Sequence, residues 1–150
     1  MKPGLLDVNV LISLIDPAHE FHDPAHVWFQ RNRKYGWATC PITENGCVRV
    51  VSKSAYPNGG ITPSQVREVL AVFGTADDHL FWPDALSLLD SGLFNLNEAG
   101  PKNITDAYLL GLARFRGGRL VTFDRKIRPQ WVTGAGDSDL ELILRNPALS

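Results

Sequence analysis

Hydrophobic residues along the chain form five short runs, separated by longer segments of helical character. Runs of this length are typical of buried strands, and they cover residues 4–8, 37–41, 80–82, 119–124 and 140–144. Capping residues, prolines or glycines bound the segments between them, which predict helices over residues 9–15, 23–34, 43–52, 64–73, 84–91 and 103–113. Strands that alternate with helices indicate an α/β fold, in which helices cover both faces of a parallel sheet.

The length and composition of the chain are those of one globular domain. It has 150 residues, of which 44% are hydrophobic and 21% charged, and no repeat or linker divides it, so we expect a single domain over residues 1–150. The net charge of −1 does not favour any class of partner. Cys40 and Cys47 lie in apolar runs that favour buried thiols over a disulfide. With no leader and no apolar stretch of about 20 residues, we expect a cytoplasmic protein without a membrane span.

Four acidic residues occupy equivalent places in the predicted fold. Asp7 and Asp124 fall at the carboxyl ends of apolar strands, and Glu44 and Asp106 fall in the first turns of helices. In an open α/β sheet these strand ends and helix starts meet at one rim, where ligands bind. We therefore expect the four carboxylates to lie close together, although they are far apart in the sequence.

Carboxylates gathered in this way predict a divalent metal site. They repel one another, and some would hold protons at neutral pH unless a cation screened them. Mg²⁺ and Mn²⁺ prefer oxygen ligands and keep positions for water and a substrate phosphate. Two such ions, about 3.5–4 Å apart, stabilise the attacking and leaving oxygens of a phosphodiester. Asn9 and Thr122 provide neutral oxygens that orient the ligands or bound waters.

Each acid also has an ordinary structural explanation. Glu44 and Asp106 would favour the positive end of a helix dipole, which contributes about 0.3–1 kcal/mol. Asp7 and Asp124 are harder to explain in this way, because each adjoins an apolar run where a lone ionised carboxylate is costly. The complete set of acids favours the metal site more than any one member does.

Basic residues surround the helix and strand that carry Asp106 and Asp124. A nuclease needs such residues to hold the phosphate backbone, whereas a solvated surface is the ordinary alternative. Arg49 lies about one and a half helical turns beyond Glu44, where it would face a groove and contact RNA or a protein partner. The basic residues are Arg114, Arg116, Arg119, Arg125, Lys126 and Arg128, of which Arg114, Arg125 and Lys126 join Arg49 as candidate substrate contacts.

Three histidines have the spacing of a helical metal site. His19, His22 and His26 are three and four residues apart. Asp23 is suited to cap the following helix and Pro24 to its first position, which would place His19 and His22 before the helix. No cysteine lies nearby to complete a zinc site, so we do not expect these histidines to bind a metal.

Four segments resemble, in order, the successive acidic motifs of the PIN-domain family. More narrowly, the chain resembles the VapC-type toxins of bacterial toxin–antitoxin pairs. The resemblance extends from Leu5 to Asp124, but residues 77–97 match no motif of the family. The four segments are Leu5–Leu11, Thr43–Gly46, Ile104–Leu109 and Leu120–Asp124.

This resemblance implies both a fold and an activity. The fold is a three-layer α/β/α sandwich around a mostly parallel sheet of four or five strands. The activity is that of a Mg²⁺- or Mn²⁺-dependent endoribonuclease that cleaves cellular RNA through a metal-activated water and leaves a 5′-phosphate and a 3′-hydroxyl. The resemblance also implies a cognate antitoxin in the active-site groove and a homodimer. It assigns the metal-binding and catalytic roles to Asp7, Glu44, Asp106 and Asp124.

Two other functions are compatible with the pattern. An aspartyl phosphatase would use Asp7 as a nucleophile, but its acid would then stand at Asn9, which cannot exchange a proton as a carboxyl can. A domain of the same fold that binds RNA or protein without cleavage is the non-enzymatic alternative, because fold alone does not give function. Metal-dependent cleavage separates that binding domain from a nuclease.

Overall fold

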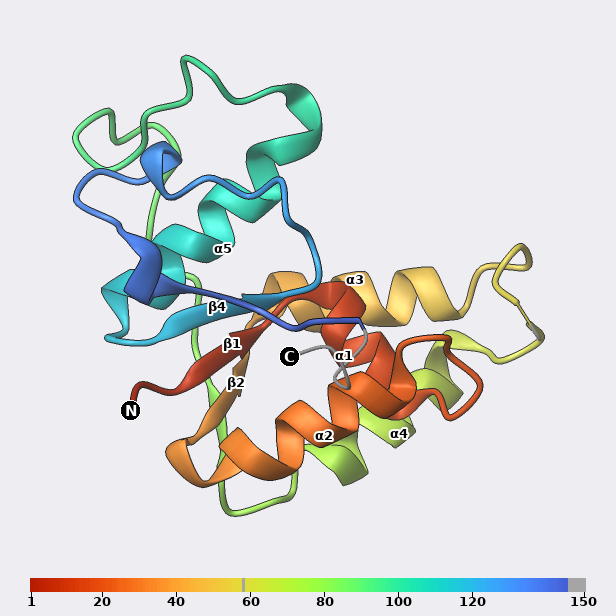
Figure 1. The fold of residues 1–150 in the computed structure, drawn as a ribbon. Helices are drawn as coiled ribbons and strands as arrows, with labels where there is room; N and C mark the ends of the chain where they lie inside the picture. Colours follow the sequence, from red (N-terminus) through yellow and green to blue (C-terminus); the bar gives the residue numbers. More distant parts are fainter. Residues whose placement is uncertain (58, 146–150) are drawn as a thin grey trace.

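Five short strands form one all-parallel sheet at the centre of the molecule (Figure 1). The computed structural model describes residues 1–57 and 59–145. The order β3-β2-β1-β4-β5 places the first strand in the middle, and every neighbouring pair is parallel. This confirms the predicted fold class and sheet. The strands are β1 (Gly4–Leu6), β2 (Trp37–Thr39), β3 (His79–Phe81), β4 (Arg119–Thr122) and β5 (Leu140–Leu142).

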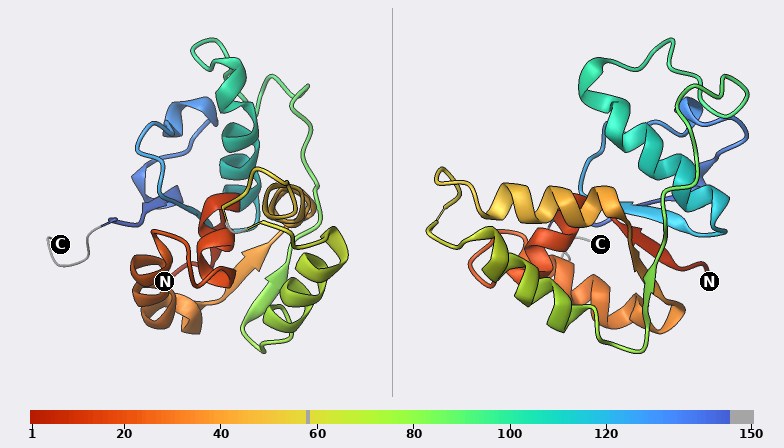
Figure 2. Two further views of the ribbon diagram at one scale, coloured as in Figure 1. Left: turned by 90° about the vertical axis from the view of Figure 1, so that its right-hand side faces the viewer. Right: turned by 180° about the vertical axis from the view of Figure 1, so that it is seen from behind.

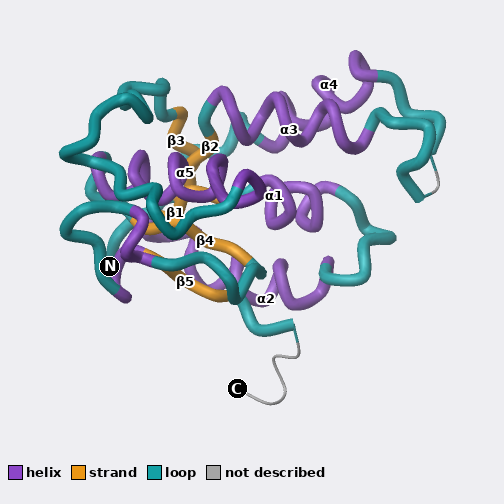
Figure 3. Tube along the Cα trace, turned by 90° about the horizontal axis from the view of Figure 1, so that it is seen from above, coloured by secondary structure: helices purple, strands orange, loops and turns teal. Residues whose placement is uncertain are grey.

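Five α-helices cover the two faces of the sheet and complete the three layers. Figure 2 shows α5 on one side of the strands and α2 and α4 on the other, and Figure 3 shows α1 to α4 side by side when the molecule is seen from above. The predicted three-layer sandwich is therefore confirmed. The helices are α1 (Val8–Ile15), α2 (His22–Asn32), α3 (Pro41–Val51), α4 (Pro63–Phe73) and α5 (Ile104–Phe115).

Two hydrophobic cores lie on opposite faces of the sheet. Successive residues of a strand point to opposite faces, so Leu5 and Leu120 pack in the core that contains α5. Their neighbours Leu6 and Val121 pack in the other core, with residues of α1, α2, α3 and α4. Burial of both faces explains why the central strands β1, β2 and β4 read as largely apolar runs.

The segment 84–91, predicted as a short helix, forms turns instead. The Ser87 hydroxyl accepts a hydrogen bond from the backbone N–H of Leu89, and the Asp90 carboxylate accepts one from Gly92. Side chains that take neighbouring N–H groups in this way compete with helical hydrogen bonding. The prediction was wrong because these turns, together with the packing of Leu86 against the α5 core, replace the helix.

Among the described residues, the four helices α1 to α4 begin one or two residues earlier than predicted. α2 begins at His22 with Phe21 as its N-cap, so Asp23 is not the cap and Pro24 is the third helical residue. A proline is tolerated there, because the N–H groups of the first helical turn have no partner within the helix. α3 begins at Pro41, which occupies the favoured first position.

Both cysteines are buried and free, which confirms the expected reduced thiols. Burial raises the pKa of the Cys47 thiol to about 12, so this side chain stays protonated at neutral pH. Over the described ranges, no helix has both the length and the apolar character needed to cross a membrane.

Candidate active site

Asp7 lies at the carboxyl end of β1, where the chain turns directly into α1. Its side chain is buried, with 8% of the residue exposed, and one carboxylate oxygen accepts a hydrogen bond of 2.8 Å from the Thr122 hydroxyl. Burial is the main reason that the pKa of Asp7 is raised, and the charge of Asp124 adds to the shift. The structure therefore brings three of the predicted residues together from β1 and the end of β4.

Asp106 joins this group from the first turn of α5. Burial is the largest cause that raises the pKa of Asp106 to about 7, and the nearby charges of Asp7 and Asp124 raise it further. Each of these charges acts on Asp106 because the starts of α1 and α5 and the end of β4 lie at one rim of the sheet. The prediction that distant acids meet is thus met by the three aspartates.

Thr122 fixes the geometry between two of these aspartates. Its hydroxyl donates to the carboxylate of Asp7 and accepts a hydrogen bond of 3.0 Å from the backbone N–H of Asp124. The Asp124 carboxylate in turn accepts from the backbone N–H of Lys126 at 2.8 Å. A single hydroxyl therefore holds the side chain of one acid and the backbone of the other. Asn9, the second residue of α1, is exposed at the same end of the helix.

The donor set of the three aspartates fits a hard divalent cation. Besides burial, the charge of Asp124 raises the pKa of Asp7, and the charges of Asp7 and Asp124 raise the pKa of Asp106, which is the situation that a bound cation relieves. In residues 1–57 and 59–145, no group of three His, Cys, Asp or Glu side chains is positioned to hold a metal ion. Mg²⁺, however, usually takes only one or two protein carboxylates and completes its shell with water and substrate phosphate.

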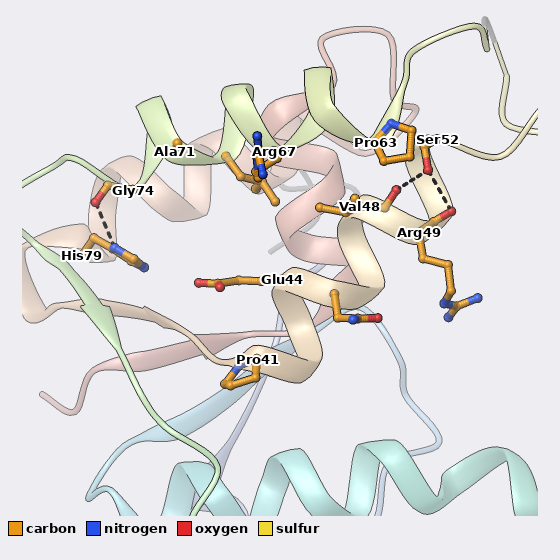
Figure 4. A pocket seen from close by; sticks show the side chains of 12 residues that line it. Pro41, Glu44, Val48, Arg49, Ser52, Pro63, Arg67, Ala71, Gly74 and His79 are labelled. Carbon is orange, nitrogen blue, oxygen red and sulfur yellow. Dashed lines mark hydrogen bonds between the residues drawn. The ribbon is translucent and has the colours of Figure 1, made fainter.

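The side chain of Glu44 points into a pocket between α3 and α4, which none of the three aspartates lines (Figure 4). Its carboxylate accepts a hydrogen bond of 2.6 Å from the Thr39 hydroxyl, which also lies 2.8 Å from Nε2 of His79. Glu44 is not among the charges that raise the pKa of Asp7 or Asp106. The structure thus places Glu44 beside the three aspartates instead of among them.

The orientation of Glu44 follows from the packing of α3 on α1. A Cβ atom at Gly46 would lie 2.8 Å from Cγ2 of Val8, so Gly46 is the point of close approach between these helices. Two residues of an α-helix are separated by about 200° around the axis. Glu44 therefore lies on the side of α3 opposite to Gly46 and faces the pocket between α3 and α4.

The predicted basic contacts separate into two groups. Arg125 and Lys126 are exposed immediately after Asp124, as a substrate contact requires. Arg114 lies two turns of α5 beyond Asp106, and its guanidinium donates at 3.1 Å to Asp139. Among the other basic residues, the buried Arg119 forms an ion pair of 2.7 Å with Glu141. The structure thus does not bring Arg114 to the three aspartates.

The three histidines connect the end of α1 to α2. His22 Nδ1 lies 2.8 Å from the carbonyl oxygen of Ser13, and His26 Nε2 lies 3.2 Å from that of Leu14. His19 Nδ1 accepts from the backbone N–H of Phe21 at 3.0 Å. These backbone contacts use a ring nitrogen of each histidine and give the histidines a structural role. His22 is nevertheless the first residue of α2, so it does not precede the helix as predicted.

A pocket of about 350 Å³ opens beside the aspartates. Asn45, Arg49 and Thr105 are its polar lining residues, and Val8 forms part of its apolar wall. Of these three residues, only Arg49 was predicted from the sequence as a site residue, whereas Asn45 and Thr105 were not. The sequence did carry a signal for Asn45 and Thr105, because they are the chain neighbours of Glu44 and Asp106. Residues next to acids that meet at one rim of the sheet lie near that rim as well.

Comparison with known families agrees with this arrangement of strands and acids. The family described as "PIN domain" matches residues 4–129, which is most of the chain. The chain belongs to the PIN-domain family. The match begins before Asp7 and ends after Asp124, so it includes every acid of the candidate site.

Curated relatives of this PIN domain include several ribonucleases of Mycobacterium tuberculosis. Ribonuclease VapC44 of strain CDC 1551 / Oshkosh is 43% identical over 133 residues, covering 88% of this chain and 93% of the relative. Ribonuclease VapC38 of strain H37Rv is 42% identical over 121 residues, covering 81% and 84%. Ribonuclease VapC29 of strain CDC 1551 / Oshkosh is 39% identical over 120 residues, covering 80% and 84%. The similarity therefore extends over most of the length of each relative.

Proposed function

We propose that this PIN domain is a metal-dependent endoribonuclease and the toxin of a type II toxin–antitoxin pair. The observation that carries the proposal is the buried Asp7, which shares its surroundings with Asp106 and Asp124 at one rim of the sheet. The relatives named as VapC ribonucleases support the same activity.

One or two of the three aspartates, Asp7, Asp106 and Asp124, would bind Mg²⁺ or Mn²⁺ directly, and water and substrate phosphate would complete the ion's shell. When bound, such an ion activates water and offsets the negative charge that develops on an attacked phosphodiester. Thr122 keeps the Asp7 carboxylate oriented through its hydroxyl and leaves the other carboxylate oxygen for a ligand. Asn9, exposed at the start of α1, would orient water next to Asp7.

Positive charge around the aspartates would hold the RNA backbone. Arg125 and Lys126 follow Asp124 on the exposed loop after β4. α1, α3 and α5 also begin at this rim, and the N-terminal ends of helices favour phosphate groups. We assign Arg125, Lys126 and Arg49 to substrate contact, whereas the ion pair of Arg114 with Asp139 gives that residue a structural role.

The proposed partners are an RNA substrate and a cognate antitoxin, and the proposed assembly is a homodimer. An antitoxin would inhibit the enzyme by covering the aspartates. A toxin of this kind acts on cytoplasmic RNA and is encoded beside its antitoxin, so a small gene immediately upstream is expected.

Incubation of the purified chain with total cellular RNA tests the proposed activity. We expect cleavage with Mn²⁺ or Mg²⁺, and no cleavage after EDTA removes the ion, because ionised aspartates alone repel the phosphate. End mapping should find 5′-phosphate and 3′-hydroxyl ends. An RNA that shifts on a gel but keeps its length with added metal would instead identify a binding domain. Trapping of a phosphate analogue on Asp7 would identify an aspartyl phosphatase.

We propose that Glu44 is a positioning residue, which acts from the neighbouring pocket through its hydrogen bond with the Thr39 hydroxyl. We expect Glu44→Gln to keep most of the metal-dependent activity, within about tenfold of the wild-type kcat/KM, because the amide preserves the hydrogen bond to Thr39. Glu44→Ala should lower the thermal stability more than Glu44→Gln does, since it leaves the Thr39 hydroxyl without this partner. A loss in Glu44→Gln as large as that of an aspartate variant, together with weaker Mn²⁺ binding, would make Glu44 a metal ligand.

A further inference from the structure

The pocket beside the aspartates has the position of a nucleotide subsite. Val8 and Thr105 line it, and they are the direct chain neighbours of Asp7 and Asp106. A phosphodiester held at the aspartates must therefore place one adjoining nucleotide next to this pocket. Its volume of about 350 Å³ lies within the range of about 300–1,000 Å³ that is usual for small-ligand pockets.

The lining of the pocket suits a base and its phosphate. Val8, Pro41 and Ile42 form an apolar wall against which the face of a base can pack. Among the described residues, the seven that line the pocket include no acid, and Arg49 gives it a positive charge. The pocket therefore favours RNA, which carries negative phosphates, over a partner that offers basic side chains.

The polar groups of this lining have free hydrogen-bonding capacity. Asn45, Arg49 and Thr105 are exposed, and no hydrogen bond within residues 1–57 and 59–145 uses their side-chain atoms. Asn45 and Arg49 are four residues apart on α3, so their side chains lie on one face of the helix. An amide that both donates and accepts is able to distinguish bases, whereas a guanidinium suits a phosphate.

We propose that this pocket seats one nucleotide flanking the scissile phosphodiester, with Asn45 reading the edge of its base and Arg49 contacting its phosphate. The proposal rests on the ribonuclease activity proposed above and adds the residues that select the cleavage sequence. Thr105 supplies a further hydroxyl to the same nucleotide, and the apolar wall positions the base beside Asn45.

The reading role of Asn45 is tested on short single-stranded RNAs that are randomised around a cleavage position, with Mn²⁺. Asn45→Asp replaces the amide donor by an acceptor, so we expect the base preference to change at one flanking position only, by about five- to a hundredfold. Asn45→Ala should abolish the preference at that position. The matched control is Asn97→Asp, an exposed asparagine outside the pocket, which should keep the wild-type preference throughout.

The phosphate contact is tested by Arg49→Gln, with Arg31→Gln as the control. Arg31 is exposed on α2 and lines no part of the pocket. We expect Arg49→Gln to raise KM about tenfold with little change in kcat, and to lower the slope of log affinity against log salt by about 0.7. Arg31→Gln should change neither quantity.

The outcomes separate this proposal from the activity on which it rests. Wild-type protein that cleaves no RNA with Mn²⁺ overturns the proposed activity. If the wild type cleaves, but Asn45→Asp and Asn45→Ala keep its base preference, the subsite is wrong. A KM for Arg49→Gln equal to that of Arg31→Gln overturns the phosphate contact. The phosphate contact is also wrong if Arg49→Gln weakens the binding of a protein partner and leaves RNA cleavage unchanged.

Discussion

Asp7→Asn is expected to lower RNA cleavage by about a thousandfold or more while leaving the fold intact. The substitution removes a charge that the proposed metal site requires, and the loss of several kcal/mol of transition-state stabilisation costs about tenfold in rate for each 1.4 kcal/mol. The measurement is kcat/KM with saturating Mn²⁺, compared with the wild type at equal concentration.

The same substitution is expected to stabilise the metal-free protein at pH 8. Burial raises the pKa of Asp7, so its contribution to stability is full below the unfolded value of about 4 and is lost as pH rises through the folded value. Asparagine has a similar volume, still accepts from Thr122 and carries no charge to bury. Each kcal/mol gained should raise the thermal midpoint by about 2–4 °C in EDTA.

Opposite signs of the two effects distinguish a functional acid from a structural one. If Asp7→Asn unfolds at a lower temperature than the wild type in EDTA, Asp7 stabilises the fold and the loss of activity has a trivial cause. A variant that cleaves RNA at the wild-type rate would instead remove Asp7 from the site. Asp90→Asn serves as the matched control, because this exposed aspartate lies in the 84–91 segment.

The sequence pattern predicts the sheet and three of the acids because both depend on local features. The strands β1, β2 and β4 are buried on both faces and are largely apolar for that reason, so they were recognisable from composition, whereas β3 is partly exposed and β5 is half-buried. The parallel topology then brings the ends of β1 and β4 and the start of α5 to one rim. Asp7, Asp106 and Asp124 meet for that reason, without any information about their side chains.

The placement of Glu44 depended on packing that the sequence does not express. The position of an acid in the first turn of a helix gives its height along the axis but leaves its direction around the axis undetermined. Here that direction is set by the contact of Gly46 with Val8 on another helix. A glycine in a helix is a recognisable signal of close approach, but the sequence does not say which element approaches.

Ion pairs between distant residues were equally outside the reach of the sequence. Arg114 and Asp139 are 25 residues apart, and their pairing removes a candidate RNA contact. The 84–91 segment differed from its prediction because its serine and aspartate side chains bond to nearby N–H groups. In each case the observed conformation depends on a hydrogen bond or ion pair with one particular residue. Propensity and periodicity describe only the segment itself and do not identify that residue.

Binding of Mn²⁺ is expected to weaken below pH 7 and to release protons. Burial and the charges of Asp7 and Asp124 raise the pKa of Asp106 to about 7, so at pH 6 most molecules hold a proton on a group that must ionise to bind metal. The apparent affinity should fall about tenfold for each pH unit below 7 and level off above it. Calorimetry in two buffers of different ionisation enthalpy measures the affinity and the protons released together.

The stability of the metal-free protein should also follow the titration of Asp106, but it should decrease with rising pH, whereas the metal affinity increases. A carboxyl whose pKa is raised on folding contributes stability below its unfolded value of about 4, and that contribution is lost as pH rises toward the folded value of about 7. The thermal midpoint in EDTA should therefore fall between pH 5 and pH 8, and saturating Mn²⁺ should raise it most at pH 8, where Asp106 is ionised. Asp106→Asn should flatten both dependences, because it removes the titrating group. A metal affinity that stays constant from pH 5.5 to pH 8 in the wild type would show that the ion does not displace a proton from Asp106. Asp106 would then not belong to the metal site.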